Sequence, residues 1–191
     1  MSVTSNDLEG GLRLIQFSGQ SATQSFSREF LPQIAQAIDA GLKHPNIRAI
    51  VLTGEGKFFS AGADIHAFAQ AIEQDEAPQL IRDLTGILHP LLLRMRQSST
   101  VTIAAINGAC AGGGLGLALA CDARIASPKA KMAASYSGMG LSPDGGTTWL
   151  LPRLVGNQVS RRFFFENEVW DAEQCVSCLL YTSDAADDGL S

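Results

Sequence analysis

The sequence has few charged residues and no cluster of basic ones. Charged side chains make up 17% of the 191 residues, and the formal net charge is −5. Nucleic acids and anionic membranes are bound through basic patches, so this charge balance argues against both as partners. We therefore expect no nucleic acid and no membrane as a partner, and a small molecule becomes the first class of ligand to consider.

Long apolar runs are also missing. The chain has no stretch of about 18 uninterrupted apolar residues, and its polar start, MSVTSNDLEGG, has no apolar signal core. These absences argue against a spanning helix and predict a cytoplasmic location. A hydrophobic content of 46% instead suits one globular domain with a sizeable core.

Cysteine is scarce and poorly arranged for binding a metal. Cys110 and Cys121 stand in apolar surroundings and are expected to be small core residues. Cys175 and Cys178 form a single CxxC pair without a second pair to complete a metal site. The sequence therefore predicts neither a metal site nor a disulfide.

Three consecutive glycines, Gly112 to Gly114, join two apolar segments. Val101–Ile106 (VTIAAI) is typical of a buried strand, and Leu115 opens a Leu- and Ala-rich run that predicts a helix. The first amides of a helix lack partners and lie at the positive end of its dipole, so they can bind a polarised oxygen. We interpret this junction as half of an oxyanion hole, with a tight turn as the alternative. The GxGxxG order of a dinucleotide site and the Gly-Lys-Ser/Thr of a phosphate loop are both absent.

Periodicity predicts alternating strands and helices along the rest of the chain. An apolar stripe over residues 25–43 predicts an amphipathic helix that Ser25 could cap, and a second stripe over 80–95 predicts a long helix. Pro90 is expected to kink or restart the long helix near His89. Strands are expected at 12–17, 47–53, 122–126 and 131–135, a loop at 136–146, and two short helices at 147–155 and 158–166.

A second candidate for ligand contact is FFSAGADI at residues 58–65. Its small residues let the backbone approach a ligand closely, and they also suit a helix start with Ser60 or Asp64 near the cap. Together with NGACAGGGLGLALACDARIA and GMGLSPDGGTTWLLPRLVG, this segment resembles the enoyl-CoA hydratase/isomerase family, the crotonase superfamily. The resemblance covers residues 10–172 and implies an α/β fold, a ββα superhelix, with one core domain over residues 1–174.

The resemblance implies acyl-coenzyme A thioesters as substrates, with coenzyme A as part of the substrate and no separate cofactor. The backbone amides of Ala63 and Gly113 are then expected to hold the thioester oxygen, where fixed donors stabilise an enolate. Gly112 belongs to the same thioester contact. The segment from Ala61 through Asp64 to Ile65 is expected to receive the adenine of coenzyme A.

The acid and base positions of the family differ in this chain. Two-glutamate hydratases of the family have glutamates where this sequence has Gly116 and Tyr136, and a tyrosine with a pKa of about 10 is a poor base. Tyr136 stays a substrate-contacting candidate. The remaining carboxylate is Asp144, which the resemblance to one-carboxylate isomerases and to 4-chlorobenzoyl-CoA dehalogenase implies is catalytic. A turn aspartate bonded to its own backbone is the alternative for Asp144, and a surface or CoA-facing role is expected for His66.

These residues predict enoyl-CoA isomerisation by proton transfer through Asp144. A hydratase with water held by Asp144 or Tyr136 and an inactive acyl-CoA-binding member of the family are the alternatives. From Cys175 onward the family pattern is lost, and CVSCLLYTSDAADDGLS resembles translated adapter read-through. We expect residues 175–191 to be a poorly packed, non-family tail in place of the family's C-terminal helices. The family implies a homotrimer or hexamer.

Overall fold

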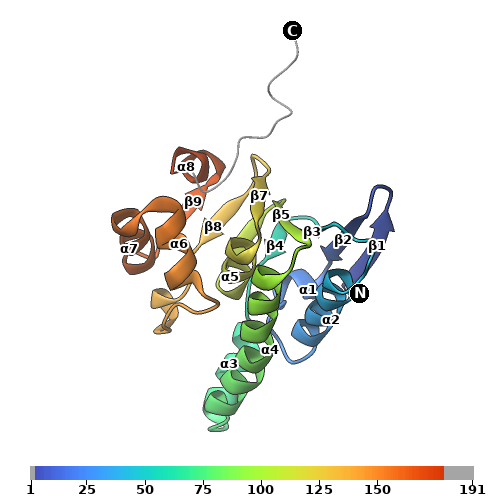
Figure 1. The fold of residues 1–191 in the computed structure, drawn as a ribbon. Coiled ribbons are helices and arrows are strands. Elements are labelled where there is room, and N and C mark those ends of the chain that lie inside the picture. Colours follow the sequence, from blue (N-terminus) through green and yellow to red (C-terminus); the bar gives the residue numbers. More distant parts are fainter. Residues whose placement is uncertain (1–2, 179–191) are drawn as a thin grey trace.

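The computed structural model describes residues 3–178 and contains two sheets joined by helices (Figure 1). A five-stranded sheet has the order β1-β2-β3-β5-β7, and a four-stranded sheet has the order β4-β6-β8-β9. Neighbouring strands are parallel except for the pairs β1–β2 and β8–β9. The strands are β1 Thr4–Leu8, β2 Leu12–Phe17, β3 Ala49–Gly54, β4 Phe58–Ser60, β5 Val101–Ile106, β6 Ala109–Ala111, β7 Ala123–Ala126, β8 Lys131–Ala133 and β9 Val169–Asp171.

The two sheets are built by a repeated strand-strand-helix unit. The chain places β3, β5 and β7 in the first sheet and the strand that follows each of them, β4, β6 and β8, in the second. Along the chain, helices follow each of β4, β6 and β8. This arrangement confirms the predicted ββα superhelix.

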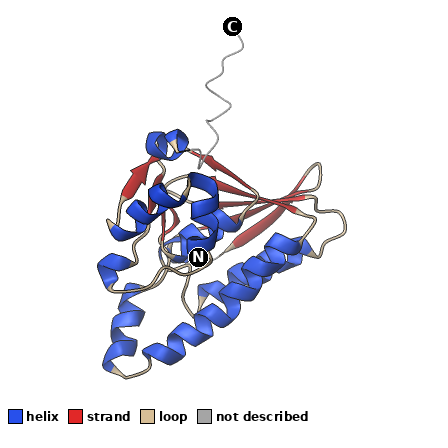
Figure 2. Ribbon diagram, turned by 60° about the vertical axis from the view of Figure 1, so that its left-hand side comes forward, coloured by secondary structure: helices blue, strands red, loops and turns tan. Residues whose placement is uncertain are grey.

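The helices differ in how much of their surface is buried, and the long ones lie along one side of the strands (Figure 2). Seven of the eight residues of α5 are buried, which explains why its sequence is apolar on every side. No helix of the described residues is both long and apolar enough to cross a membrane. The helices are α1 Gln20–Thr23, α2 Phe30–Leu42, α3 Ile65–Glu73, α4 Ala77–Gln97, α5 Gly113–Ala120, α6 Thr147–Val155, α7 Asn157–Phe165 and α8 Ala172–Ser177, with a short 3-10 helix η1 at Ser137–Met139.

The helix predicted from residue 25 begins later than expected. Helix α2 starts at Phe30, so the prediction that Ser25 caps it is wrong. The Ser25 hydroxyl instead donates to the Ser21 carbonyl (2.6 Å), and Phe26 forms a β-bridge with Ala63. Pairing with a distant segment has overridden the helical periodicity at residues 25–29.

Helix α4 runs without interruption through Pro90. The predicted restart near His89 is therefore wrong. Proline costs this helix one hydrogen bond, to the Gly86 carbonyl, but Leu88, Leu91 and Leu92 are all buried around it. Burial of these side chains, each contributing about 1.5–3 kcal/mol, outweighs the lost bond.

The C-terminal part of the described chain is ordered through α8. Asp171 accepts a hydrogen bond from Gln174 N–H, the Gln174 side chain accepts one from Asp171 N–H, and the two form a capping box. Cys175 is buried, and the helix continues to Ser177. The predicted boundary at residue 175 falls inside this helix. Residues 179–191 lie outside the described residues, so the predicted poor packing of the tail stays a prediction.

Candidate functional site

Strands β4 and β6 lead into the two segments predicted to bind a thioester oxygen. Ser60 pairs with Cys110 in parallel register, and Ala63 and Gly113 each lie three residues farther along. A Cβ placed on Gly62 would lie 3.2 Å from the Gly113 nitrogen, so the two segments touch. Ala63 and Gly113 both line a cavity of about 480 Å³. The two predicted segments therefore meet at one cavity.

The amide of Gly113 lies at the start of a buried helix. Helix α5 begins at Gly113, two residues earlier than Leu115, and Gly112 precedes it with φ 53° and ψ −124°, a conformation suited to glycine. Its N–H lies at the positive end of the helix dipole. Within residues 3–178, neither the Gly113 N–H nor the Ala63 N–H donates a hydrogen bond to another protein group. Both donors are available to a ligand oxygen.

Asp144 lies in the predicted loop and is held there through its backbone. Its carbonyl accepts hydrogen bonds from the Thr147 hydroxyl (2.8 Å), the Thr147 N–H (3.2 Å) and the Tyr136 hydroxyl (3.3 Å). Its carboxylate is bonded to a histidine of another element and is 45% exposed. The backbone forms the turn while the side chain remains free of it, and Asp144 lines the same cavity as Ala63 and Gly113.

His89 is the partner of that carboxylate and was not predicted from the sequence. Its Nε2 lies 2.7 Å from Asp144 Oδ1 across 55 positions of the chain. Asp144 lines both the 480 Å³ cavity and a neighbouring hollow of about 650 Å³, whereas His89 lines only the second of these two. His66, the histidine considered from the sequence, is an exposed residue in the first turn of α3. In the sequence His89 was noted only because it precedes Pro90. That position carries no information about Asp144.

The position where the family's first glutamate was expected is filled by backbone. A Cβ on Gly116 would lie 2.7 Å from the Gly145 carbonyl oxygen and 3.0 Å from the Gly145 Cα. Such approaches are shorter than real Cβ contacts, so any side chain at residue 116 must displace the Asp144 loop. Among the described residues that line the 480 Å³ cavity, Asp144 is the one carboxylate.

Tyr136 lies in the cavity wall and acts on the loop. Burial is the main reason that the pKa of its hydroxyl is raised well above 10. The phenol therefore stays protonated at neutral pH. It therefore donates its hydrogen bond to the Asp144 carbonyl and is not a base. The alternative in which Tyr136 holds the water of a hydratase stays a prediction.

The residues predicted to contact coenzyme A are only partly brought together. Ala61, Ile65 and Gly112 line the 480 Å³ cavity with the two amides. Asp64 lines a smaller adjacent hollow of about 150 Å³ and caps α3, accepting from the N–H groups of His66 (3.0 Å) and Ala67 (3.2 Å). The cap was one of the two roles considered for Asp64, and its contact with coenzyme A stays a prediction.

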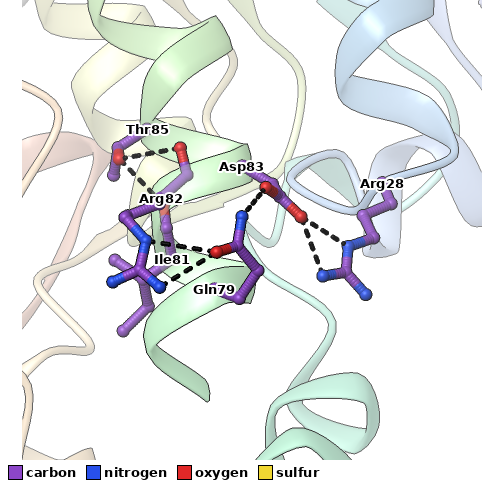
Figure 3. Close-up of polar contacts among 6 residues, drawn as sticks. All are labelled: Arg28, Gln79, Ile81, Arg82, Asp83 and Thr85. Atoms are coloured by element: carbon purple, nitrogen blue, oxygen red, sulfur yellow. Dashed lines mark hydrogen bonds and ion pairs between the residues drawn. The ribbon is translucent and has the colours of Figure 1, made fainter. Parts of the chain in front are cut away.

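Helix α4 supplies an apolar wall to the cavity. Ile81 and Thr85 line it, and Thr85 donates its hydroxyl hydrogen bond to the Ile81 carbonyl (2.8 Å; Figure 3). Outside the cavity lining, Asp83 accepts from Arg28 (2.8 and 3.0 Å) and Gln79 (2.6 Å), which ties α4 to the segment before α2. The remaining apolar lining includes Phe68, Leu84, Leu88, Met139 and Leu141.

The site therefore combines two available amides, one carboxylate and an apolar wall. Two fixed donors suit a carbonyl oxygen that gains negative charge, and a carboxylate beside them suits proton transfer at a neighbouring carbon. Among the described residues, no group of three or more His, Cys, Asp and Glu side chains is placed to hold a metal ion. The arrangement of two amides beside a carboxylate suits the stabilisation of an enolate.

The chain is similar to known proteins over nearly all of its described length. A family model described as enoyl-CoA hydratase/isomerase matches residues 7–175. The chain is 38% identical over 163 residues to "Probable enoyl-CoA hydratase EchA14" of Mycobacterium tuberculosis, covering 85% of this chain and 62% of that protein. It is 34% identical over 149 residues to the 1,2-epoxyphenylacetyl-CoA isomerase of Escherichia coli, covering 78% and 56%.

The fold is likewise similar to solved structures. The structure of DspI from Pseudomonas aeruginosa matches with a TM-score of 0.84 at 37% identity, covering 95% of this chain and 67% of that one. An enoyl-CoA hydratase from Polaromonas matches with a TM-score of 0.85 at 31% identity, covering 97% and 71%. The chain spans about three fifths of the length of the curated relatives it matches, 62% and 56% for the two named above.

Proposed function

Because the chain belongs to the enoyl-CoA hydratase/isomerase family, we propose that it binds an acyl-CoA thioester and isomerises its enoyl group. The amides of Ala63 and Gly113 donate to the thioester oxygen. Asp144 removes a proton from C2 or C4, and the electron pair moves into the enolate. The same carboxyl group then returns the proton to the other carbon, so the double bond has moved and no atom is gained or lost.

The observation that carries this proposal is the contact between Gly116 and Gly145. Adding water across a double bond is served by one group that activates water and another that protonates carbon. Position 116 has no room for a second carboxylate, because the Gly145 backbone lies 2.7 Å from where its Cβ would be. A single carboxylate suffices for isomerisation, since one group can both remove and return the proton. The E. coli relative bears an isomerase name, although the substrate in that name is an epoxide and not an enoyl thioester.

Hydration is the second candidate, and the His89–Asp144 pair favours it. Two titratable side chains 2.7 Å apart can polarise a water between them and the substrate. The M. tuberculosis relative bears a hydratase name. The placement of His89 in the neighbouring hollow, away from the amides, weighs against this alternative.

The remaining features of the proposal concern location and assembly. We propose a cytoplasmic location, as expected from the sequence, and a homotrimer or hexamer, as the family resemblance implies. Light scattering of the purified chain tests the assembly, and a monomer with acyl-CoA affinity would remove this part of the proposal alone.

The test is conversion of a 3-enoyl-CoA to the 2-enoyl isomer by the full chain and by Asp144→Asn. We expect the variant to lose on the order of 100-fold or more in kcat while still binding acyl-CoA, because the amides remain. Asp39→Asn is the matched control, since it makes the same change in the ion pair with Arg94 (2.8 Å), outside the cavity. Unchanged activity in Asp144→Asn would remove Asp144 from the mechanism. Acyl-CoA binding without turnover by the unmodified chain would support the inactive binding alternative.

Isotopically labelled water separates the two reactions. Hydration places the label in a 3-hydroxyacyl product, whereas isomerisation leaves the acyl group free of labelled oxygen. A labelled product, lost in His89→Gln, would favour hydration through the His89–Asp144 pair and would contradict isomerisation as the main reaction.

A further inference from the structure

A chain of buried hydroxyl groups lies behind the cavity. Ser25 and Ser60 are fully buried, and neither lines the 480 Å³ cavity. Gly62 N–H donates to the Ser60 hydroxyl (3.3 Å), which donates to the Ser25 hydroxyl (3.0 Å). Ser25 in turn donates to the Ser21 carbonyl (2.6 Å). The donors therefore all point the same way, from Gly62 through Ser60 and Ser25 to Ser21.

Further hydrogen bonds join the same two segments. Ala61 N–H donates to the Ala22 carbonyl (2.8 Å), and Phe26 N–H donates to the Gly62 carbonyl (3.0 Å). Residues 60–63 are thus held on both sides of Gly62 by residues 21–26, a segment that belongs to neither sheet. This explains why residues 25–29 depart from the predicted helix.

The same groups also lie against the second amide segment. A Cβ on Gly114 would lie 2.4 Å from the Ser60 hydroxyl oxygen, and a Cβ on Gly113 would lie 2.9 Å from the Phe26 ring. Ser60 and its bonded neighbours therefore fill the space between the Ala63 segment and the first turn of α5. Any movement of this buried chain alters the separation of the two amides.

We propose that Ser25 and Ser60 are positioning residues that set the spacing and direction of the Ala63 and Gly113 amides. Buried hydroxyls in a continuous chain polarise one another, and leaving a member unsatisfied is costly, so the chain has one preferred arrangement. Neither serine touches the substrate. The inference rests on the proposed function, because the oxygen to be bound is that of the thioester.

Kinetics of Ser25→Ala and Ser60→Ala provide the first test. We expect kcat/KM for isomerisation to fall roughly 10- to 100-fold in each variant, mainly through kcat, because small displacements of oxyanion donors are costly. The double variant should lose less than the product of the two single losses, because both serines share one hydrogen bond. Ser160→Ala is the matched control, since Ser160 is 1% exposed and donates to the Asn157 carbonyl (3.1 Å) in α7. A purely structural role predicts equal losses of Tm and equal, small changes of kcat in all three single variants.

The carbonyl stretching frequency of a bound, carbon-labelled acyl-CoA provides the second test, and it needs no turnover. Hydrogen bonds to the thioester oxygen lower this frequency in infrared difference spectra. We expect a downshift with the unmodified chain that is reduced in Ser25→Ala and Ser60→Ala and kept in Ser160→Ala. If both serine variants show the same downshift as the unmodified chain, the positioning role is overturned and the proposed function is left intact. Bound acyl-CoA with no downshift in the unmodified chain would overturn the shared oxyanion hole and the positioning role together.

Discussion

The two sides of the cavity are built in opposite ways. The amide side, residues 60–63 and 112–114, presents backbone groups that are set by strand register, a helix start and buried hydroxyls. The carboxylate side, residues 136–146, is a loop that presents the half-exposed carboxylate of Asp144, which is bonded to His89 of α4. In the proposed function, backbone groups bind the thioester oxygen, whereas side chains of the carboxylate side determine which reaction follows. Changes on the amide side should affect every reaction of the site, and changes on the carboxylate side should alter which reaction occurs.

The largest effect is expected for Gly113→Ala on the amide side. Its Cβ would lie 2.9 Å from the buried Phe26 ring, so either the ring or the start of α5 must shift, and we expect the amide to lose alignment. We expect kcat to fall on the order of 100-fold, as when one oxyanion donor is removed. Gly86→Ala is the control, because that helical glycine has open space around it and alanine should stabilise α4 by about 0.5–1 kcal/mol. Equal activities of the two variants would contradict the rigidity assigned to this side.

A smaller effect is expected for Gly116→Glu, which places a carboxylate where the two-glutamate hydratases have one. The side chain must displace Gly145 and, with it, Asp144, so isomerisation should fall by roughly tenfold or more. Hydration should not appear, because the loop that would complete the pair has moved. Chromatography of products from a 2-enoyl-CoA measures this. A gain of 3-hydroxyacyl-CoA would show that the loop adapts, and the carboxylate side would then be more permissive than its packing indicates.

The smallest effect is expected from Asp83→Asn, which lies on α4 outside both sides of the cavity. Hydrogen bonding by Arg28, followed by Gln79, lowers the pKa of the Asp83 carboxyl below its ordinary 3.8. A lowered folded-state pKa adds stability that is fully present above pH 3.8 and is lost as the pH falls through the lowered value. Urea unfolding should show a small destabilisation of Asp83→Asn at neutral pH that disappears in acid. A difference that persists in acid would mean that packing, and not charge, ties α4 to the segment before α2.

Most of the fold could be predicted because the repeated unit has strong local patterns. The alternating burial of β2 and β3, the apolar run of β5 and the stripes of α2 and α4 are visible in the sequence. The three-residue strands β4 and β6 were missed, because so short a strand is defined by its neighbours and not by its own periodicity. The helical pattern failed at Ser25 and Phe26 for the same reason, since these two residues bond to Ser60 and Gly62.

The part of the candidate site that consists of backbone groups could be predicted, because it lies in short motifs of small residues. Ala63, Gly113 and Asp144 line one cavity as their motifs indicate. His89 and the blocked position at Gly116 could not be found this way. Each depends on a contact with the loop after Tyr136, across 55 positions for His89 and 29 for Gly116, and no local pattern encodes such a contact.

The pairing of Ser60 with Cys110 also governs how the site tolerates changes of length. Each residue of a strand advances the chain by about 3.3 Å, more than the length of a hydrogen bond. Inserting a single residue between Ser60 and Ala63, or between Cys110 and Gly113, would carry one donor out of reach of the oxygen that the other still holds. The loop at 136–146 pairs with neither strand, so its length is not set by this register.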